Sequence, residues 1–279
     1  MLKKTIGGSC PTSEGFSRYL VGLRYLGQHY CGWQVETGVN KPSISNALQQ
    51  AFLKVIGSNN FTNLKLSSRT DAGVHALHNY VHVDLARRKE ISLSKQPAEI
   101  SVDELRPPQY TFLPPFEPNT LKNALNYHLN EEEIMVTDVL QKSPDFDCRA
   151  DCTSRTYIYR IICPSPQYYS QHHKEHKRNH KFHSFHKDYA WFVKKPLNVD
   201  AMNNAARHLQ GENDFASFQG AGCQSAVSYR AVFDCSVTKF DFGDAQHNNA
   251  SGVILSDTFL MVSTSRIYLL DIRFHFVLQ

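Results

Sequence analysis

The feature that most restricts the fold is an order of elements that occurs twice along the chain. Each half runs from an alternating strand through a long excursion to an amphipathic helix and a further strand. We therefore expect two related α+β units, at 18–141 and 142–279, after a polar N-terminal lead at 1–17. The strands are expected at 18–27, 61–66, 79–85, 134–140, 155–162 and 229–240.

The expected helices have recognisable ends. Ser43 is a good N-cap, and apolar residues then repeat at spacings of three and four until Gly57 ends the pattern. A short helix is expected at 121–129, and a further one begins after Asn198 and stops at Gly211.

The strand expected at 79–85 alternates polar and aliphatic side chains. Its polar set is Tyr80, His82 and Asp84, and its aliphatic set is Val81, Val83 and Leu85. Because successive side chains point to opposite faces, this pattern predicts a strand that is buried on one face only.

Two segments interrupt the units. Residues 87–118 carry six prolines, which predicts an irregular insertion. Residues 167–188 hold six of the fourteen histidines, namely His172, His173, His176, His180, His183 and His186. Their spacing would place several imidazoles on one helical face, but only Glu175 accompanies them as an acidic ligand. We interpret this segment as a polar surface insertion and predict no metal site.

The composition is that of a soluble globular protein, with 41% hydrophobic and 20% charged residues. No stretch approaches the roughly 20 apolar residues of a spanning helix, so no membrane association is expected. Seven cysteines with no CxxC pair favour reduced thiols and an intracellular location. Cytoplasm and mitochondrion both remain open, because the N-terminus has only a weak presequence character. The net charge of +4 is compatible with a polyanionic partner.

The loop at 68–75 is the candidate site for chemistry. The chain has no phosphate-binding glycine loop, no GxSxG and no HExxH, so no nucleotide cofactor is expected. Asp71 lies between a strand and Gly73, and Arg69 is close enough to keep a carboxylate ionised or to bind a phosphate. From these residues alone, a turn with a structural ion pair is the favoured interpretation.

The segment from Arg69 to Ala76, Arg-Thr-Asp-Ala-Gly-Val-His-Ala, resembles the signature of the TruA family of tRNA pseudouridine synthases. Three further blocks resemble that family, and the four motifs occur in the family's order: Tyr25 to Gln34, Phe146 to Arg149 with Thr153 to Tyr159, and Gly211 to Phe218 with Cys223 to Ser225. The resemblance covers residues from about 18 to 240 and is closest to eukaryotic proteins of the pseudouridine-synthase-like 1 type.

This resemblance implies a fold of two ferredoxin-like or RRM-like units with joined antiparallel sheets and a central cleft. It implies an isomerase that converts uridine to pseudouridine in tRNA without a cofactor. Asp71 matches the catalytic aspartate, acting as nucleophile or as base toward the sugar. Tyr157 matches the tyrosine that binds the flipped uracil, and Arg69 would bind phosphate or fill the gap left by the base. A homodimer that presents tRNA to the cleft is also implied.

The C-terminal segment departs from the family pattern. Residues 256–260 begin it, but the atypical tail at 261–279 offers no counterpart to a helix that carries an arginine. We therefore expect an incomplete second unit with an unpaired sheet edge, which the alternating residues Ile272, Phe274, Phe276 and Leu278 would cover in part. The alternative function is a catalytically impaired RNA-binding paralogue or splice form.

Overall fold

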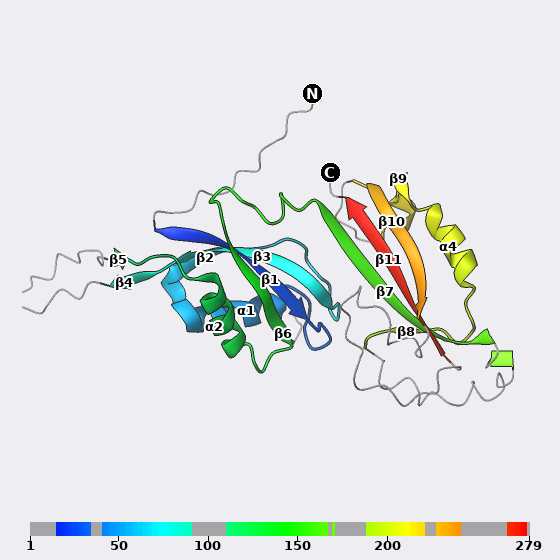
Figure 1. Cartoon of the computed structure of the whole chain (residues 1–279), viewed down its shortest axis with the longest axis horizontal. Helices are drawn as coiled ribbons and strands as arrows, with labels where there is room; N and C mark the ends of the chain where they lie inside the picture. The colour runs from blue at the N-terminus through cyan, green and yellow to red at the C-terminus, as the bar shows by residue number, and fades with distance from the viewer. Residues whose placement is uncertain are drawn as a thin grey trace, which may run out of the picture. The chain divides into compact units, whose positions relative to one another are not determined.

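The computed structural model describes residues 15–34, 41–90, 110–166, 169–170, 188–220, 227–240 and 267–277. The chain divides into two compact units, Met1–Cys152 and Thr153–Gln279 (Figure 1). Each unit combines a mostly or wholly antiparallel sheet with helical elements, so the predicted α+β class is confirmed.

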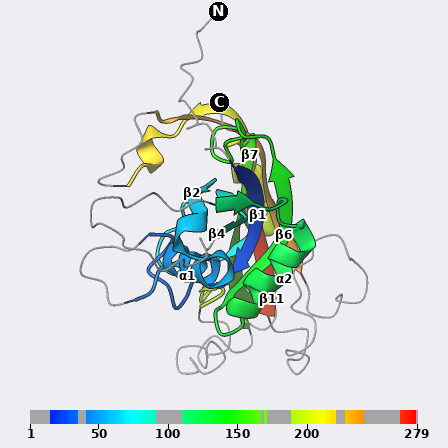
Figure 2. The same cartoon turned by 90° about the vertical axis from the view of Figure 1, so that its left-hand side faces the viewer.

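Unit 1 is built on a four-stranded antiparallel sheet in the order β2-β3-β1-β6. Helices α1 and α2 lie side by side against this sheet (Figure 2). Its elements are β1 (Phe16–Tyr25), α1 (Ile44–Ile56), the 3-10 helix η1 (Ser58–Asn60), β2 (Phe61–Leu66), β3 (Ala76–Ala86), β4 (Arg88–Glu90), β5 (Tyr110–Phe112), α2 (Pro118–His128) and β6 (Ile134–Lys142).

Local signals fix the ends of both helices. The Ser43 side chain accepts a hydrogen bond from the amide of Asn46 at the start of α1, and Gly57 closes the helix with φ +79°. Glu117 caps α2 by accepting from the amide of Thr120 at 2.6 Å. Pro118 occupies the first turn of α2, where the missing N–H costs nothing. The helix predicted from Ser43 to Gly57 is confirmed.

One face of the sheet forms the core with the two helices. The buried side chains are Tyr19, Val21, Leu23 and Tyr25 of β1, Ile44, Leu48 and Phe52 of α1, Leu121 and Leu125 of α2, and Val136 of β6. The odd-numbered positions of β1 therefore face the helices, as the two-residue period of a strand requires.

β3 is buried on both faces of the sheet, so the prediction that this strand is buried on one face only is wrong. His82 is 3% exposed and Asp84 0% exposed. The segment after β6 covers the face opposite the helices, since the carbonyl of Phe146 accepts from Arg18 at 2.7 Å and the amide of Cys148 donates to His82 at 3.0 Å. His82 and Asp84 are both satisfied by protein groups, His82 by this amide and Asp84 by the side chains of Arg18 and Asn63.

The proline-rich insertion is not wholly irregular. Arg88–Glu90 (β4) and Tyr110–Phe112 (β5) pair as a short antiparallel ribbon, with Arg88 opposite Phe112. Residues 91–109 between them lie outside the described residues, and so do the six histidines of the 167–188 segment.

Unit 2 contains a five-stranded sheet in the order β8-β7-β11-β10-β9. All neighbours are antiparallel except β7 and β8, which are parallel. Its elements are β7 (Ser154–Pro164), β8 (Trp191–Phe192), α4 (Val199–Arg207), β9 (Gly211–Asp214), the 3-10 helix η3 (Ala216–Phe218), β10 (Tyr229–Phe240) and β11 (Ile267–Val277). Asn198 caps α4 by accepting from the amide of Ala201, which confirms the predicted start of that helix.

The C-terminal strand β11 occupies the centre of this sheet. It pairs with β7 from Ile267↔Pro164 to Val277↔Ser154 and with β10 on its other side, and Figure 1 shows it in red between them. The expected strand in the tail is confirmed, but it lies inside the sheet, so the expectation of an edge that is unpaired or only partly covered is wrong for these strands. Backbone pairing on both sides satisfies the N–H and C=O groups that an edge strand would expose.

Within the described ranges, no helix has both the length and the apolar character needed to cross a lipid bilayer.

Candidate active site

The loop between β2 and β3 carries both site residues predicted for unit 1. The side chains of Arg69 and Asp71 are exposed. Neither forms a hydrogen bond or an ion pair with any residue that the structure describes. The alternative of a structural ion pair between them is therefore wrong. The carboxylate and the guanidinium are both available to a ligand.

The backbone just before Asp71 is held tightly. The amide of Trp33 donates to the carbonyl of Thr70 at 3.1 Å, and the hydroxyl groups of Tyr25 and Thr70 are 2.8 Å apart. Gly32 approaches closely, because a Cβ there would lie 2.8 Å from the Thr70 carbonyl oxygen. Its φ of +101° also favours glycine.

The backbone just after Asp71 is held as well. The amide of Val74 donates to the carbonyl of Asp71 at 3.1 Å and closes a turn through Gly73, whose φ is +79°. The amide of Gly27 donates to Nδ1 of His75 at 3.1 Å. Because the Gly27 amide can only donate, Nδ1 of His75 is the acceptor in this contact. Asp71 is thus a solvent-facing carboxylate on a backbone that is clamped on both sides.

Sequence reasoning missed two residues that support this loop. Asn79 of β3 donates from Nδ2 to the Tyr25 hydroxyl at 3.2 Å and to the carbonyl of Ser68 at 2.7 Å. Burial raises the pKa of Tyr25, although bonds to Thr70 and Asn79 oppose the rise, so the phenol stays neutral and keeps its proton. The segment from Tyr25 to Gln34 packs directly on the loop, and its structural role is to support the backbone before Asp71.

The third predicted residue, Tyr157, lies on β7 of unit 2 and is 45% exposed. It shares a strand face with Ile161 and Cys163, which are buried with Val237 of β10. Tyr159 on the same face is 65% exposed. The first half of this strand face therefore presents aromatic rings, whereas its second half belongs to the core.

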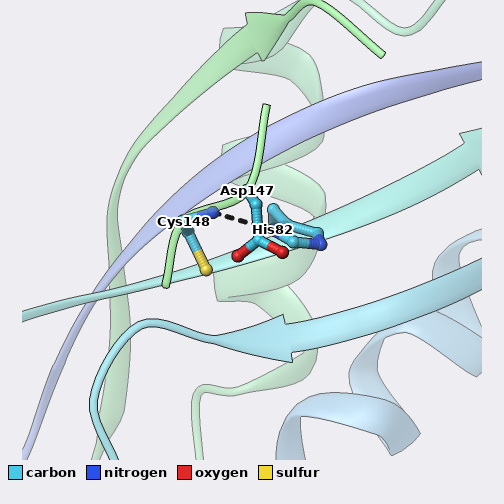
Figure 3. Close-up of side chains that lie close together, drawn as sticks. All are labelled: His82, Asp147 and Cys148. Atoms are coloured by element: carbon cyan, nitrogen blue, oxygen red, sulfur yellow. Dashed lines mark hydrogen bonds between the residues drawn. The ribbon is translucent and has the colours of Figure 1, made fainter. Parts of the chain in front are cut away.

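Unit 1 also contains a buried cluster of His82, Asp147 and Cys148 (Figure 3). Their potential ligand atoms lie within 4.8 Å of one another. This spacing is short enough for the three residues to hold one metal ion. Each group is already engaged. His82 accepts from the amide of Cys148 at 3.0 Å, and the Cys148 thiol donates to the carbonyl of Lys65 at 3.2 Å.

Electrostatics also oppose a metal at this cluster. Burial raises the pKa of the Cys148 thiol to about 11, so the thiolate that a metal requires is disfavoured. Burial would raise the pKa of Asp147, but hydrogen bonds from Lys65, Ala150 and Arg149 lower it to about 2. Asp147 is therefore an ionised carboxylate that pairs with Lys65. The cluster therefore has a structural role, because its hydrogen bonds and ion pair hold the segment after β6 against β2 and β3.

No family model matches the chain. Three bacterial relatives, each named tRNA pseudouridine synthase A, cover most of it. The protein of Sinorhizobium fredii is 31% identical over 225 residues, which are 80% of this chain and 72% of the relative. The Rhizobium meliloti protein is 32% identical over the same shares. The Agrobacterium fabrum protein is 32% identical over 80% of this chain and 67% of the relative. The chain belongs to the tRNA pseudouridine synthase A, or TruA, family.

Proposed function

We propose that this protein is a tRNA pseudouridine synthase, an isomerase that converts uridine to pseudouridine within tRNA. The observation that carries the proposal is the clamped loop of Arg69, Thr70 and Asp71, found in a chain that is about 30% identical to synthases of that name over 80% of its length. Because the backbone on both sides of Asp71 is fixed by hydrogen bonds, its exposed carboxylate can approach a substrate atom in one defined geometry, as catalysis requires.

The reaction is balanced without a redox partner. The bond between N1 of uracil and C1′ of ribose breaks, the base turns, and a bond forms between C5 and C1′. The proton on C5 is lost, and N1 gains one. In this proposal Asp71 attacks C1′ or removes a proton from the sugar, and neither route requires a metal or a nucleotide cofactor.

The other two residues bind the substrate in this proposal. Arg69 has five N–H donors with no protein partner among the residues described, which suits a backbone phosphate or the gap left by a flipped base. Tyr157 presents an exposed ring that suits stacking on the extruded uracil. In this proposal the Tyr157 hydroxyl also assists proton transfer.

The test is release of tritium from tRNA that carries [5-³H]uridine, since forming the C5 bond expels the C5 hydrogen. Asp71→Asn and Asp71→Ala are expected to abolish release while tRNA affinity, measured by filter binding, stays within about threefold. Asp145→Asn is the matched control, because Asp145 is an exposed aspartate of the same unit outside the loop. Wild-type turnover in either Asp71 variant would refute the assignment.

A homodimer and an intracellular compartment, cytoplasm or mitochondrion, complete the proposal and rest on the family resemblance and the reduced cysteines. Light scattering of the purified chain measures the first, and fractionation of the source cells measures the second. The alternative of an inactive RNA-binding paralogue predicts tRNA affinity without any tritium release.

A further inference from the structure

A buried hydrogen-bond chain runs from Asn79 through Tyr25 to Thr70, the residue that precedes Asp71. Tyr25 is 1% exposed and Asn79 is 8% exposed. The Tyr25 hydroxyl lies 3.2 Å from Nδ2 of Asn79 and 2.8 Å from Oγ1 of Thr70. These hydrogen bonds thus link β3 and β1 to the loop, and the Tyr25–Thr70 contact spans 45 residues of sequence.

Chemistry fixes the direction of this chain. The amide nitrogen of Asn79 can only donate, so the Tyr25 oxygen accepts from it. Asn79 cannot turn its amide around, because its Oδ1 accepts from the amide of Tyr80 at 2.9 Å and its Nδ2 also donates to the carbonyl of Ser68. The remaining proton of Tyr25 needs an acceptor in a buried place, and among the described residues Oγ1 of Thr70 lies within reach of it.

The consequence falls on Thr70. Its oxygen accepts from Tyr25, so its own proton is directed elsewhere, and no group in the described part of the chain takes it. Its carbonyl is held independently by the amide of Trp33. The half-buried threonine hydroxyl therefore keeps a proton to donate, in the residue directly before the exposed Asp71.

We propose that Thr70 donates a hydrogen bond to an oxygen of the target nucleotide, and that Tyr25 and Asn79 are positioning residues that aim this donor. The inference rests on the proposed function and extends it to three residues with no assigned role. The donor acts beside Asp71, where the nucleotide reacts, so its loss is expected to lower kcat more than it raises KM.

The first test compares two tyrosines of the same strand and the same face. Tyr25→Phe removes the hydroxyl that reaches Thr70. Tyr19→Phe is the matched control, since Tyr19 is 0% exposed and its hydroxyl donates to the carbonyl of Phe116 at 2.9 Å, outside the loop. Tyr25→Phe is expected to lower kcat about tenfold, the effect of one hydrogen bond, with KM within about twofold. Tyr19→Phe is expected to keep the wild-type kcat.

The second test separates positioning from stability. Thr70→Val is expected to lose kcat by about tenfold or more, whereas Thr70→Ser keeps the hydroxyl and most of the activity. In the Thr70→Val background, Tyr25→Phe should lower kcat no further, because the donor that it aims is gone. If Tyr25→Phe fails to fold, the comparison of Thr70→Val with Thr70→Ser still decides whether the hydroxyl matters.

Two outcomes would overturn the inference. One is a Tyr25→Phe effect of the same size with and without the Thr70 hydroxyl, and the other is equal kcat in Thr70→Val and Thr70→Ser. The wild-type chain and Asp71→Asn are assayed beside them. A wild-type chain without tritium release refutes the proposed function itself, whereas an active wild type with an inert Thr70 hydroxyl refutes only this inference.

Discussion

Replacing Gly27 with alanine should displace the Asp71 loop and slow catalysis. Gly27 has no left-handed φ, so an alanine fits its backbone, and the effect is steric. A Cβ at this position would lie 2.6 Å from the carbonyl carbon of Val74 and closer still to its oxygen. Carbon atoms in contact prefer about 3.5–4.0 Å, so the loop or the end of β1 must move by about 1 Å.

The expected size follows from that shift. A misplacement of about 1 Å in a reacting group costs about 100-fold in rate, which is about 2.7 kcal/mol of activation free energy. Overpacking of this kind also lowers the free energy of unfolding by about 1–3 kcal/mol. We therefore expect Gly27→Ala to lower kcat in the tritium-release assay by about 100-fold, with the folded state retained in urea titrations.

A second glycine separates this effect from simple destabilisation. Gly57 closes α1 with φ +79°, and the nearest atom to an added Cβ is Nδ2 of Asn60 at 3.8 Å. Gly57→Ala should cost about 1–2 kcal/mol of stability through left-handed strain but leave kcat unchanged. A Gly27→Ala enzyme with kcat within about threefold of wild type would refute the reasoning, as would an equal loss in Gly57→Ala.

Three further outcomes are expected from unit 1. Arg18 binds the fully buried carboxylate of Asp84 at 2.7 and 2.8 Å, so Arg18→Met leaves this carboxylate without its cationic partner. The free energy of unfolding, measured in urea titrations, should fall by about 3–5 kcal/mol. A loss below about 1 kcal/mol would contradict this. Because the pKa of Asp147 is depressed from 3.8 to about 2, its contribution to stability is fully present above the unfolded pKa and is lost as the pH falls through about 2. The gap in unfolding free energy between wild type and Asp147→Asn should therefore shrink over that interval, and a constant gap would be inconsistent with the depressed pKa. The Cys148 thiol should resist iodoacetamide at pH 8 in the folded protein and react in urea, as mass spectrometry would reveal, whereas rapid native labelling would disprove its raised pKa of about 11.

Local chemistry allowed much of the fold to be predicted from the sequence. A serine that accepts from the amide three residues on, and a glycine that takes a left-handed φ, set the ends of α1 within a short stretch of chain. Asn198 does the same for α4. The loop with Asp71 was found by the same kind of short-range signal, because its residue order resembles a family signature.

Partners that are distant in the sequence left no such signal. The burial of both faces of β3 depends on Phe146 and Cys148, which are 128 and 66 residues from the side chains they contact. The alternation in β3 could not reveal this cover, because a polar residue in water and one satisfied by a distant backbone group look alike in a sequence.

Long-range packing also explains why the sequence did not reveal the central position of β11 or the contact between Tyr25 and Thr70. The alternation of Ile272, Phe274, Phe276 and Leu278 predicts a strand, but only the packing of unit 2 decides that the observed strand β11 lies between β7 and β10 rather than at an edge. Tyr25 lies in the strand predicted at 18–27, but only the folded sheet brings its hydroxyl to Thr70. Short-range order follows from φ/ψ preferences and caps that each residue carries with it, whereas the neighbours of a buried group are chosen when the whole chain packs.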